Sequence, residues 1–438
     1  MALFGTDGIR GKIGSELSAN LSFDVSRAFG FYLRRNLPGL PVLLGKDTRF
    51  SGDMIESAIS AGLSSQGVDV ISLGVITTPG LQYLCSYREC AGVMITASHN
   101  LAADNGIKLF SKGGLKLSPD EEACVESFVN SDFAEEPPAR IYEDKKFTDI
   151  YLNYLKERSR GIIIRGIVLD CANGSTTQYA PELFNFLHPD FLYTAGCYPD
   201  GYNINLNCGS THPEVICDLS RGLNKPSTIG FAFDGDGDRV IACDDKGNVV
   251  DGDDFLAVLS LWLKVVMGKR NFSVVGTVMT NRGLEEFLKR ENITFYRSNV
   301  GDKNVYNMMK EKGALLGAET SGHVIISNEL CGDGMIAAIY LLRSVHELGL
   351  KKLNLFKRHH QIMKSIKLES RIPSLSRELV EKIEELKKNF DGRIVVRPSG
   401  TEPIVRVMVE CKNLEEANLI CEEICNMIEN KEFKTVSS

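Results

Sequence analysis

The sequence predicts an α/β protein, and three observations support this class. Short apolar, β-branched runs recur along the chain, a turn rich in Gly and polar residues follows each run, and a stretch of helix-compatible composition follows each turn. Continuous apolar runs are typical of strands buried on both faces, as in mainly parallel sheets covered by helices. Because the same succession repeats, we expect the first three domains to be similar in topology.

The polar turns are the first candidates for a functional site. In α/β sheets, ligands bind beyond the carboxyl ends of the strands, where these turns fall. The clearest runs with their turns are VLLGKDTRFSG at 42–52, GVMITASHN at 92–100, GIVLDCANGS at 166–175, GFAFDGDGDR at 230–239 and VVGTVMTNRG at 274–283.

Length and composition restrict the class of protein. With 438 residues the chain is too long for one ordinary core, and length alone predicts about three domains. Fifty basic against 57 acidic side chains give a net charge of -7, which argues against a dedicated nucleic-acid binder. The 12 cysteines contain no CxxC pair and fit a reducing compartment.

Targeting signals are not evident. The start MALFGTDGIRG lacks a basic region followed by a long apolar one, so we expect no signal peptide. The run FLAVLSLWLKVVM is too short to span a bilayer and contains Lys264. We therefore expect a cytoplasmic protein with no membrane or nucleic-acid partner.

Changes in pattern divide the chain into four. A charged, Pro-containing stretch precedes a helix expected at about 148–158, and a new strand is expected from Ile162. Asp253 or Asp254 is expected to N-cap the helix FLAVLSLWLKVV. A helix, two strands around a loop and a closing helix form an α+β module at the C-terminus. The predicted domains are 1–155, 156–252, 253–367 and 368–438.

The stretch DGDGDR contains the most specific pattern in the chain. In an extended backbone Asp234, Asp236 and Asp238 project to one side, and their mutual repulsion requires a cation. Oxygen ligands of this charge density suit a hard ion such as Mg²⁺. A calcium EF-hand loop needs Gly at its sixth and Glu at its twelfth position, where this chain has Arg239 and Asp245. A solvated acidic turn is the alternative to a metal site.

The stretch TASHN places Ser98 beside His99. Neighbouring side chains of an extended segment point to opposite faces, so we expect His99 to be poorly placed to deprotonate Ser98. The hydrolase pattern G-x-S-x-G is absent. A plain Ser/Asn turn explains this stretch in isolation. Together with a metal loop, however, the serine suits phosphoryl transfer, with Lys108 as proton donor or acceptor.

The loop RPSGTEP, between two expected strands, combines two hydroxyls, a flexible Gly and Arg397, and Arg406 follows it. Backbone N–H groups, hydroxyls and guanidinium groups together suit a phosphate. A hairpin turn explains the loop equally well.

Two further stretches give weaker signals. GAETSGH places Glu319, Ser321 and His323 in a Gly-framed loop, where Glu319 can accept hydrogen bonds from sugar hydroxyls, although a polar surface turn explains it nearly as well. FGTDGIRG places Arg10 among glycines, where a close turn can hold the basic side chain over an anion.

The five motifs FGTDGIRG, TASHN, DGDGDR, GAETSGH and RPSGTEP occur in an order and spacing that resembles the α-D-phosphohexomutase superfamily, over essentially the whole chain. Within it, DNGIK at 104–108 and NINLNCGSTHPE at 203–214 look most like the bacterial phosphoglucosamine mutases. The resemblance implies three similar mixed-sheet α/β domains plus a C-terminal α+β domain around a central cleft. The four ranges given above would be the phosphoserine, metal-binding, sugar-binding and C-terminal phosphate-binding domains in that order.

The resemblance also implies an activity. The family's bacterial phosphoglucosamine mutases interconvert glucosamine 6-phosphate and glucosamine 1-phosphate through a phosphoserine and a 1,6-bisphosphate, feeding UDP-N-acetylglucosamine and cell-envelope synthesis. One Mg²⁺ per chain and activating phosphorylation of Ser98 are implied, as are a phosphosugar substrate, a priming kinase or bisphosphate donor, and a homodimer.

Site residues follow from the same resemblance, motif by motif. Catalysis is assigned to Ser98, Lys108, Arg10 and His99. The metal ligands are Ser98, through its phosphate, with Asp234, Asp236 and Asp238, and Arg239 lies beside the metal. The substrate-binding residues are Glu319, Ser321, Lys303, Arg397, Ser399, Gly400, Thr401 and Arg406.

Two positions depart from the family pattern. Leu101 stands where the family usually has Pro after SHN, and Lys303 stands where Arg is expected, which keeps the charge but not the bidentate geometry. Three other interpretations remain open: a phosphomannomutase or phosphoglucomutase of the same superfamily, a Mg²⁺-dependent sugar phosphatase that uses the same serine, and a non-catalytic anion- or metal-binding protein.

Overall fold

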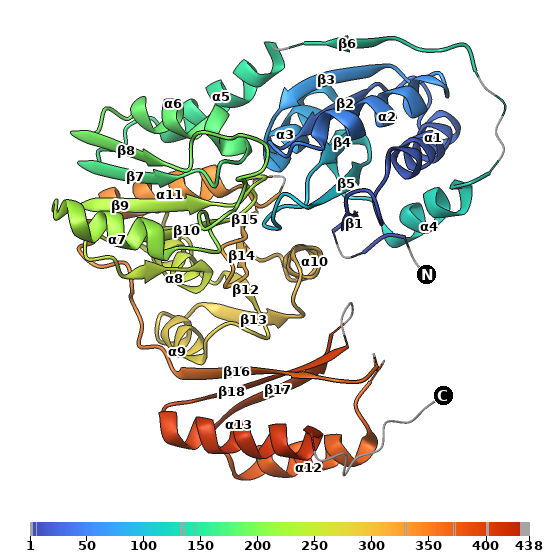
Figure 1. Cartoon of the computed structure of the whole chain (residues 1–438). Helices are drawn as coiled ribbons and strands as arrows, with labels where there is room; N and C mark the ends of the chain where they lie inside the picture. Colours follow the sequence, from blue (N-terminus) through green and yellow to red (C-terminus); the bar gives the residue numbers. More distant parts are fainter. Residues whose placement is uncertain are drawn as a thin grey trace. The chain divides into compact units, whose positions relative to one another are not determined.

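The computed structural model describes residues 3–5, 7–131, 134, 136–144, 146–327, 329, 331–370, 372, 374–399 and 403–429. The chain divides into two compact units. The first contains residues 1–277 and 293–354, and the second contains residues 278–292 and 355–438. Each unit is described by itself (Figure 1).

The N-terminal part of the first unit is built on a six-stranded mixed sheet. Its elements are β1 Ile9–Lys12, α1 Ala19–Asn36, β2 Val42–Lys46, α2 Gly52–Ser64, β3 Val70–Val75, α3 Thr78–Arg88, β4 Ala91–Ile95, β5 Asp104–Phe110, α4 Pro119–Phe128, β6 Ile141–Glu143 and α5 Lys146–Ser159, with a short 3₁₀ turn at Lys112–Gly114. The strand order is β1-β5-β4-β2-β3-β6. β2 pairs in parallel with β3 and β4, whereas β5 is antiparallel to both of its neighbours.

A second mixed sheet follows. Its elements are β7 Gly166–Asp170, the 3₁₀ turn Ser175–Gln178, α6 Ala180–Asn185, β8 Phe191–Ala195, α7 Glu214–Leu223, β9 Thr228–Phe233, β10 Val240–Cys243 and β11 Val249–Val250. The order is β11-β10-β9-β7-β8, with β7 parallel to β8 and β9. β9 and β10 are antiparallel, so residues 234–239 form the loop of a hairpin.

The third sheet completes the first unit. Its elements are α8 Gly252–Val265, β12 Ser273–Thr277, β13 Thr294–Ser298, α10 Asp302–Lys312, β14 Leu316–Ala318, β15 Val324–Ile326 and α11 Gly334–Leu348. The order is β13-β12-β14-β15, in which β12, β13 and β14 are parallel and β14–β15 is a hairpin. That hairpin presents residues 319–323 at its tip.

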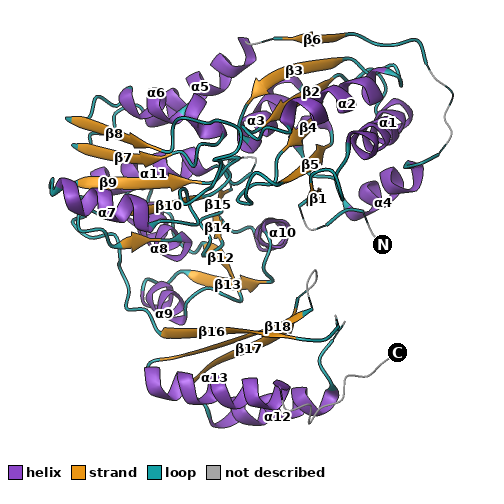
Figure 2. Ribbon diagram, viewed as in Figure 1, coloured by secondary structure: helices purple, strands orange, loops and turns teal. Residues whose placement is uncertain are grey.

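The second unit is a three-stranded antiparallel sheet with two helices against one face (Figure 2). Its elements are α9 Arg282–Arg290, β16 His360–Lys367, α12 Arg377–Asn389, β17 Gly392–Pro398, β18 Ile404–Cys411 and α13 Leu414–Glu429. Its core joins Ile383 of α12 and Val407 and Val409 of β18 to Cys421 and Ile424 of α13. The buried residues Ala417, Cys421 and Ile424 recur at helical spacing on this face of α13.

Most expected elements are present. The α/β class is confirmed, as are α5 at the expected place and the strand–loop–strand–helix order of the C-terminal module. The strand expected from Ile162 begins instead at Gly166. The N-cap of α8 is Asp251, not Asp253 or Asp254. Asp251 accepts backbone N–H groups from both, while the Asp254 side chain reaches back to the Asp251 N–H in a capping box.

The four-domain division stays a prediction. Each of the four sheets falls within one of the predicted ranges, except that β16 begins at His360, before the expected boundary at 368, and shares a sheet with β17 and β18. All 12 cysteines are described, and each is a free thiol. Within the described residues, no helix is long and apolar enough to cross a membrane.

Candidate active site

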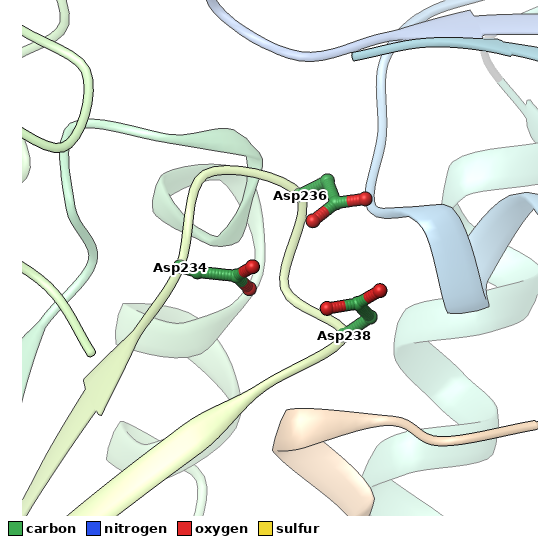
Figure 3. Close-up of side chains that lie close together, drawn as sticks. All are labelled: Asp234, Asp236 and Asp238. Carbon is green, nitrogen blue, oxygen red and sulfur yellow. The ribbon is translucent and has the colours of Figure 1, made fainter. Parts of the chain in front are cut away.

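The three aspartates of the 234–239 loop form a compact acidic cluster. Asp234, Asp236 and Asp238 each offer a carboxylate oxygen, and these oxygens lie within 4.8 Å of one another (Figure 3). All three side chains are buried. The Oδ1 atoms of Asp236 and Asp238 are buried without a hydrogen-bond partner among the described residues. Buried carboxylates with unused oxygens fit the ligand set of a hard divalent cation.

The shape of this loop differs from the expectation. We expected an extended backbone that projects the three carboxylates to one side, whereas residues 235–238 form a turn. Gly237 has a φ of +73°, a conformation that L side chains rarely adopt, and this bend turns the carboxylates toward one centre. At Gly235, an added Cβ would lie 2.6 Å from the carbonyl oxygen of Ser98, so only glycine permits this close approach.

The electrostatics of the cluster are those of crowded like charges. Burial, together with Asp238 and Asp236, raises the pKa of Asp234 well above its ordinary value. Burial acts in the same direction on Asp238, but Lys108 and His323 outweigh it and hold the pKa of that carboxyl below its usual range. The cluster therefore carries charge unevenly in the metal-free protein.

Lys108 lies on β5 and connects this cluster to the N-terminal turn. Its Nζ lies 2.9 Å from Asp236 Oδ2, 2.8 Å from Asp7 Oδ2 and 3.6 Å from Asp238 Oδ2. Burial opposes the charged form, but the carboxylates of Asp236, Asp7 and Asp238 raise the pKa of Lys108 well above its ordinary value. In this environment Lys108 is held as a cation, and its role in proton transfer stays a prediction.

Ser98 is fully buried directly after β4, facing the acidic cluster. Its Oγ donates a hydrogen bond to Asp234 Oδ2 at 2.7 Å, across 136 residues of sequence. Its φ is +52°, so the backbone is left-handed rather than extended as we expected. His99 is consequently not on the opposite face: its Nδ1 lies 3.4 Å from Ser98 Oγ.

His99 is nevertheless a weak base. Burial and the positive charges of Arg239 and Arg10 lower the pKa of His99 to about 4. The imidazole is therefore neutral at physiological pH and has little affinity for the serine proton.

Two arginines lie beside this group. Arg10 Nη2 donates to Asp7 Oδ2 at 2.6 Å. The Arg239 backbone N–H donates to Asp234 Oδ1 at 3.2 Å, and its Nε lies 3.7 Å from Asp238 Oδ1. Burial opposes the charge of Arg239, but Asp238 and Asp234 raise its pKa above the usual value.

The β14–β15 hairpin contains the loop in which we predicted sugar-binding residues. Glu319 is buried, and its Oε1 accepts the backbone N–H of Gly301 at 2.8 Å. Ser321 is exposed at the tip of the hairpin. Lys303, on the first turn of α10, donates to the Leu117 carbonyl at 3.1 Å and lies 3.3 Å from Glu122. Its ammonium group thus joins α10 to the N-terminal sheet region.

The second unit contains the remaining predicted residues. Arg397 of β17 and Arg406 of β18 are direct partners in the antiparallel ladder. Burial and the charge of Arg406 lower the pKa of Arg397. Like charges opposite each other are unfavourable unless an anion lies between or beside them. Ser399 is buried at the end of β17, and its N–H donates to the Ile404 carbonyl. Gly400 and Thr401 lie outside the described residues.

Sequence reasoning missed several members of the first unit's site. The Asp7 carboxylate accepts hydrogen bonds from Arg10, Lys108 and Lys116. Burial raises the pKa of Asp7, but these three cations outweigh burial and lower the pKa below its ordinary value. Thr78, at the start of α3, donates to Asp236 Oδ2 at 2.6 Å. Asp7 lies within the FGTDGIRG motif from which only the arginine was selected, so the motif itself contained the signal. No local pattern distinguishes Thr78.

Family models match most of the chain. The phosphoglucomutase/phosphomannomutase α/β/α domain I model matches residues 1–136, the domain III model matches 251–362, and the C-terminal domain model matches 368–427. A phosphoglucosamine mutase of Finegoldia magna is 39% identical, over 98% of each chain. Another from Thermotoga sp. is 42% identical, over 98% of this chain and 100% of the relative.

Solved structures agree in fold at lower identity. A phosphoglucomutase/phosphomannomutase family protein from Burkholderia thailandensis has a TM-score of 0.80 at 22% identity, over 99% of both chains. An Aspergillus fumigatus N-acetylphosphoglucosamine mutase, solved with GlcNAc-6P and magnesium, has a TM-score of 0.69 at 17% identity, over 98% of this chain and 95% of that one.

Proposed function

The chain belongs to the phosphoglucomutase/phosphomannomutase family, and on that premise we propose that it interconverts glucosamine 6-phosphate and glucosamine 1-phosphate. The observation that carries the proposal is the buried Ser98 hydroxyl, hydrogen-bonded at 2.7 Å to a cluster of three buried carboxylates. The choice of an amino sugar rests on the relatives of about 40% identity, which are phosphoglucosamine mutases. Such a reaction would supply the precursor of an activated amino sugar for cell-envelope synthesis.

In the proposed reaction, phosphorylated Ser98 transfers its phosphoryl group to the free hydroxyl of the sugar phosphate. The bond between Ser98 Oγ and phosphorus breaks, a bond from the sugar oxygen to phosphorus forms, and the hydroxyl proton ends on Ser98 Oγ. The resulting 1,6-bisphosphate turns over and returns its other phosphoryl group to Ser98. Lys108, charged and 2.9 Å from Asp236, serves as proton donor, while His99 and Arg10 act next to the transferring group.

The metal proposed for this site is one Mg²⁺ per chain. Asp234, Asp236, Asp238 and a phosphate oxygen on Ser98 would hold it, and Arg239 would lie beside it. The buried Oδ1 atoms of Asp236 and Asp238, which have no hydrogen-bond partner among the described residues, support this assignment. When bound, such an ion stabilises negative charge on phosphoryl oxygens.

Substrate binding is assigned to both units. Glu319 and Ser321 would accept hydrogen bonds from sugar hydroxyls, with Lys303 near them. The opposed guanidinium groups of Arg397 and Arg406 support a site for the phosphate that is not being transferred, to which Ser399, Gly400 and Thr401 would add donors.

Further partners are part of the proposal. A phosphate must first reach Ser98, from a kinase or from a sugar bisphosphate, and the chain is proposed to form a homodimer. Twelve free cysteines support a reducing compartment such as the cytoplasm.

The test compares turnover of glucosamine, glucose and mannose 1-phosphates by the purified chain primed with glucose 1,6-bisphosphate. We expect the highest kcat/KM for the glucosamine compound and no activity for Ser98→Ala. Equal or better turnover of mannose 1-phosphate would instead assign the chain to the phosphomannomutases. Release of inorganic phosphate at the rate of substrate loss would assign it to the phosphatases. Full activity of Ser98→Ala would refute a phosphoserine mechanism altogether.

A further inference from the structure

A fully buried arginine outside the assigned site lies beneath the Ser98 loop. Arg49 follows β2 in the turn KDTRFSG and is 3% exposed. Its Nε donates to Asp47 Oδ2 at 2.9 Å, and the Arg49 backbone N–H donates to Asp47 Oδ1 at 3.1 Å. Asp47, in the same turn, therefore fixes the orientation of the Arg49 guanidinium plane.

The four remaining donors of this guanidinium converge on one loop. Nη2 donates to the carbonyl oxygens of Ser98 at 3.0 Å and Asn100 at 2.8 Å. Nη1 donates to those of Leu101 at 2.5 Å and Asp104 at 3.0 Å. Backbone carbonyls shielded from water need hydrogen-bond donors, and here one side chain donates to three carbonyls of the loop after β4 and to that of Asp104, the first residue of β5.

A second side chain, from a loop distant in sequence, donates to two of the same carbonyls. Asn205 Nδ2 lies 2.8 Å from Ser98 O and 2.9 Å from Asn100 O. Asn205 is 2% exposed and comes from the loop before α7, more than 100 residues away in sequence. The Ser98 carbonyl is thus held simultaneously by Arg49 and Asn205.

The Ser98 N–H is also fixed through Asp47. It donates to Thr96 Oγ1 at 2.9 Å, and Thr96 Oγ1 donates to Asp47 Oδ2 at 2.6 Å. The Ser98 carbonyl is therefore hydrogen-bonded to Arg49, and the Ser98 N–H is connected through Thr96 to Asp47. A non-glycine residue with a φ of +52° needs such external support, because the left-handed conformation is intrinsically unfavourable.

We propose that Arg49, with Asn205, is the positioning residue of the phosphoryl-carrying serine: it holds the Ser98 backbone left-handed so that Oγ points at the metal-binding carboxylates. Within the described residues, Arg49 donates no hydrogen bond to Ser98 Oγ or to the three carboxylates, so it acts through the loop. The inference rests on the proposed function of Ser98. It predicts that loss of the guanidinium lowers the rate of transfer and leaves sugar binding nearly unchanged.

The first test variant is Arg49→Lys. Lysine keeps the charge, but its single ammonium with three donors cannot span four carbonyls and Asp47. The control is Arg343→Lys, since Arg343 likewise donates to two backbone carbonyls, those of Arg158 and Arg160, away from Ser98.

Two quantities are measured for each variant, normalised to the folded fraction from circular dichroism. One is kcat and KM for glucosamine 1-phosphate, and the other is the rate at which Ser98 takes phosphate from glucose 1,6-bisphosphate, followed by intact-protein mass spectrometry. For Arg49→Lys we expect both rates to fall by about 100-fold with KM changed less than about threefold. The control should match wild type. Rates of folded Arg49→Lys within about twofold of wild type would overturn the inference.

A second variant covers the case in which Arg49→Lys does not fold. Asn205→Ala removes two of the hydrogen bonds and should lower both rates by about tenfold at unchanged KM; unchanged rates would overturn the inference. Wild type that takes phosphate on Ser98 without converting glucosamine phosphates would refute the proposed function only, and the phosphorylation rates would still decide the role of Arg49. Wild type that takes no phosphate on Ser98 would overturn both.

Discussion

Neutralising Asp234 should stabilise the metal-free protein. The pKa of Asp234 is raised well above its ordinary value of 3.8 by burial and by the charges of Asp238 and Asp236. Between 3.8 and the raised value, the folded protein holds a proton that the unfolded chain has lost. The stability contributed by this group therefore falls as pH rises through that window, and Asp234→Asn removes the dependence.

The magnitude follows from the spacing of the carboxylates. One oxygen of each carboxylate lies within 4.8 Å of the others, and two like charges at that separation repel by about 3 kcal/mol at an effective dielectric constant of about 20. Above the raised pKa, where Asp234 is ionised, Asp234→Asn removes two such pairs, but it also removes the attraction to Arg239 and weakens the 3.2 Å hydrogen bond from the Arg239 N–H. The hydrogen bond from Ser98 survives, because the amide oxygen still accepts. We expect a net gain of about 2 kcal/mol, or about 2 °C in Tm.

The assay is thermal unfolding in EDTA and in Mg²⁺ at several pH values. Asp234→Asn should unfold at a higher Tm than wild type in EDTA above pH 5, and should gain less than wild type from added Mg²⁺. Asp218→Asn, on the exposed face of α7, is the control and should leave both values unchanged. A Tm for Asp234→Asn below that of wild type in EDTA would show that the carboxylates do not repel one another as argued.

Three further changes test other parts of the structure. Ser98→Gly should be more stable than Ser98→Ala by about 1 kcal/mol in denaturant unfolding, because glycine adopts a φ of +52° without strain; equal stabilities would count against a strained Ser98. Arg406→Gln should raise KM for the sugar phosphate. It should also raise Tm in phosphate-free buffer, because it removes the repulsion between Arg406 and Arg397; a lower Tm would argue against an anion site there. Asp251→Ala should cost about 1 kcal/mol by removing the cap of α8, measured by the same unfolding, whereas a capping role for Asp253 would leave Asp251→Ala without effect.

The elements of the site could be predicted where the signal is local. The alternation of Asp and Gly in DGDGDR, following a buried strand, indicated the acidic cluster, and the apolar runs indicated the strands that end beside it. Their backbone shape could not be predicted in the same way. An extended loop and the observed turn have the same residues in the same order. The turn depends on tertiary packing, in which Gly235 lies against the Ser98 carbonyl and Gly237 against Thr176 and Thr77.

Pairings between distant residues could not be predicted from sequence alone. Ser98 and Asp234 are 136 residues apart, and Lys116 reaches Asp7 across 109 residues and Asp302 across 186. Arg49 stood in a turn already recognised as polar, but its role depends on four carbonyls that the tertiary fold presents to it. Local patterns identify reactive groups, whereas the groups that hold them in place emerge only from the fold.

The surroundings of Ser98 favour a carrier of phosphate over a hydrolytic nucleophile. A serine that acts as a hydrolytic nucleophile needs a general base to take its proton. His99 lies 3.4 Å from Ser98 Oγ, but its pKa is lowered to about 4, and the Ser98 hydroxyl donates its hydrogen bond to Asp234. The cations Arg10 and Arg239, which lower that pKa, would also attract an anionic group on Ser98 Oγ. The same charges that make His99 a poor base therefore make the serine a good place to hold a phosphate.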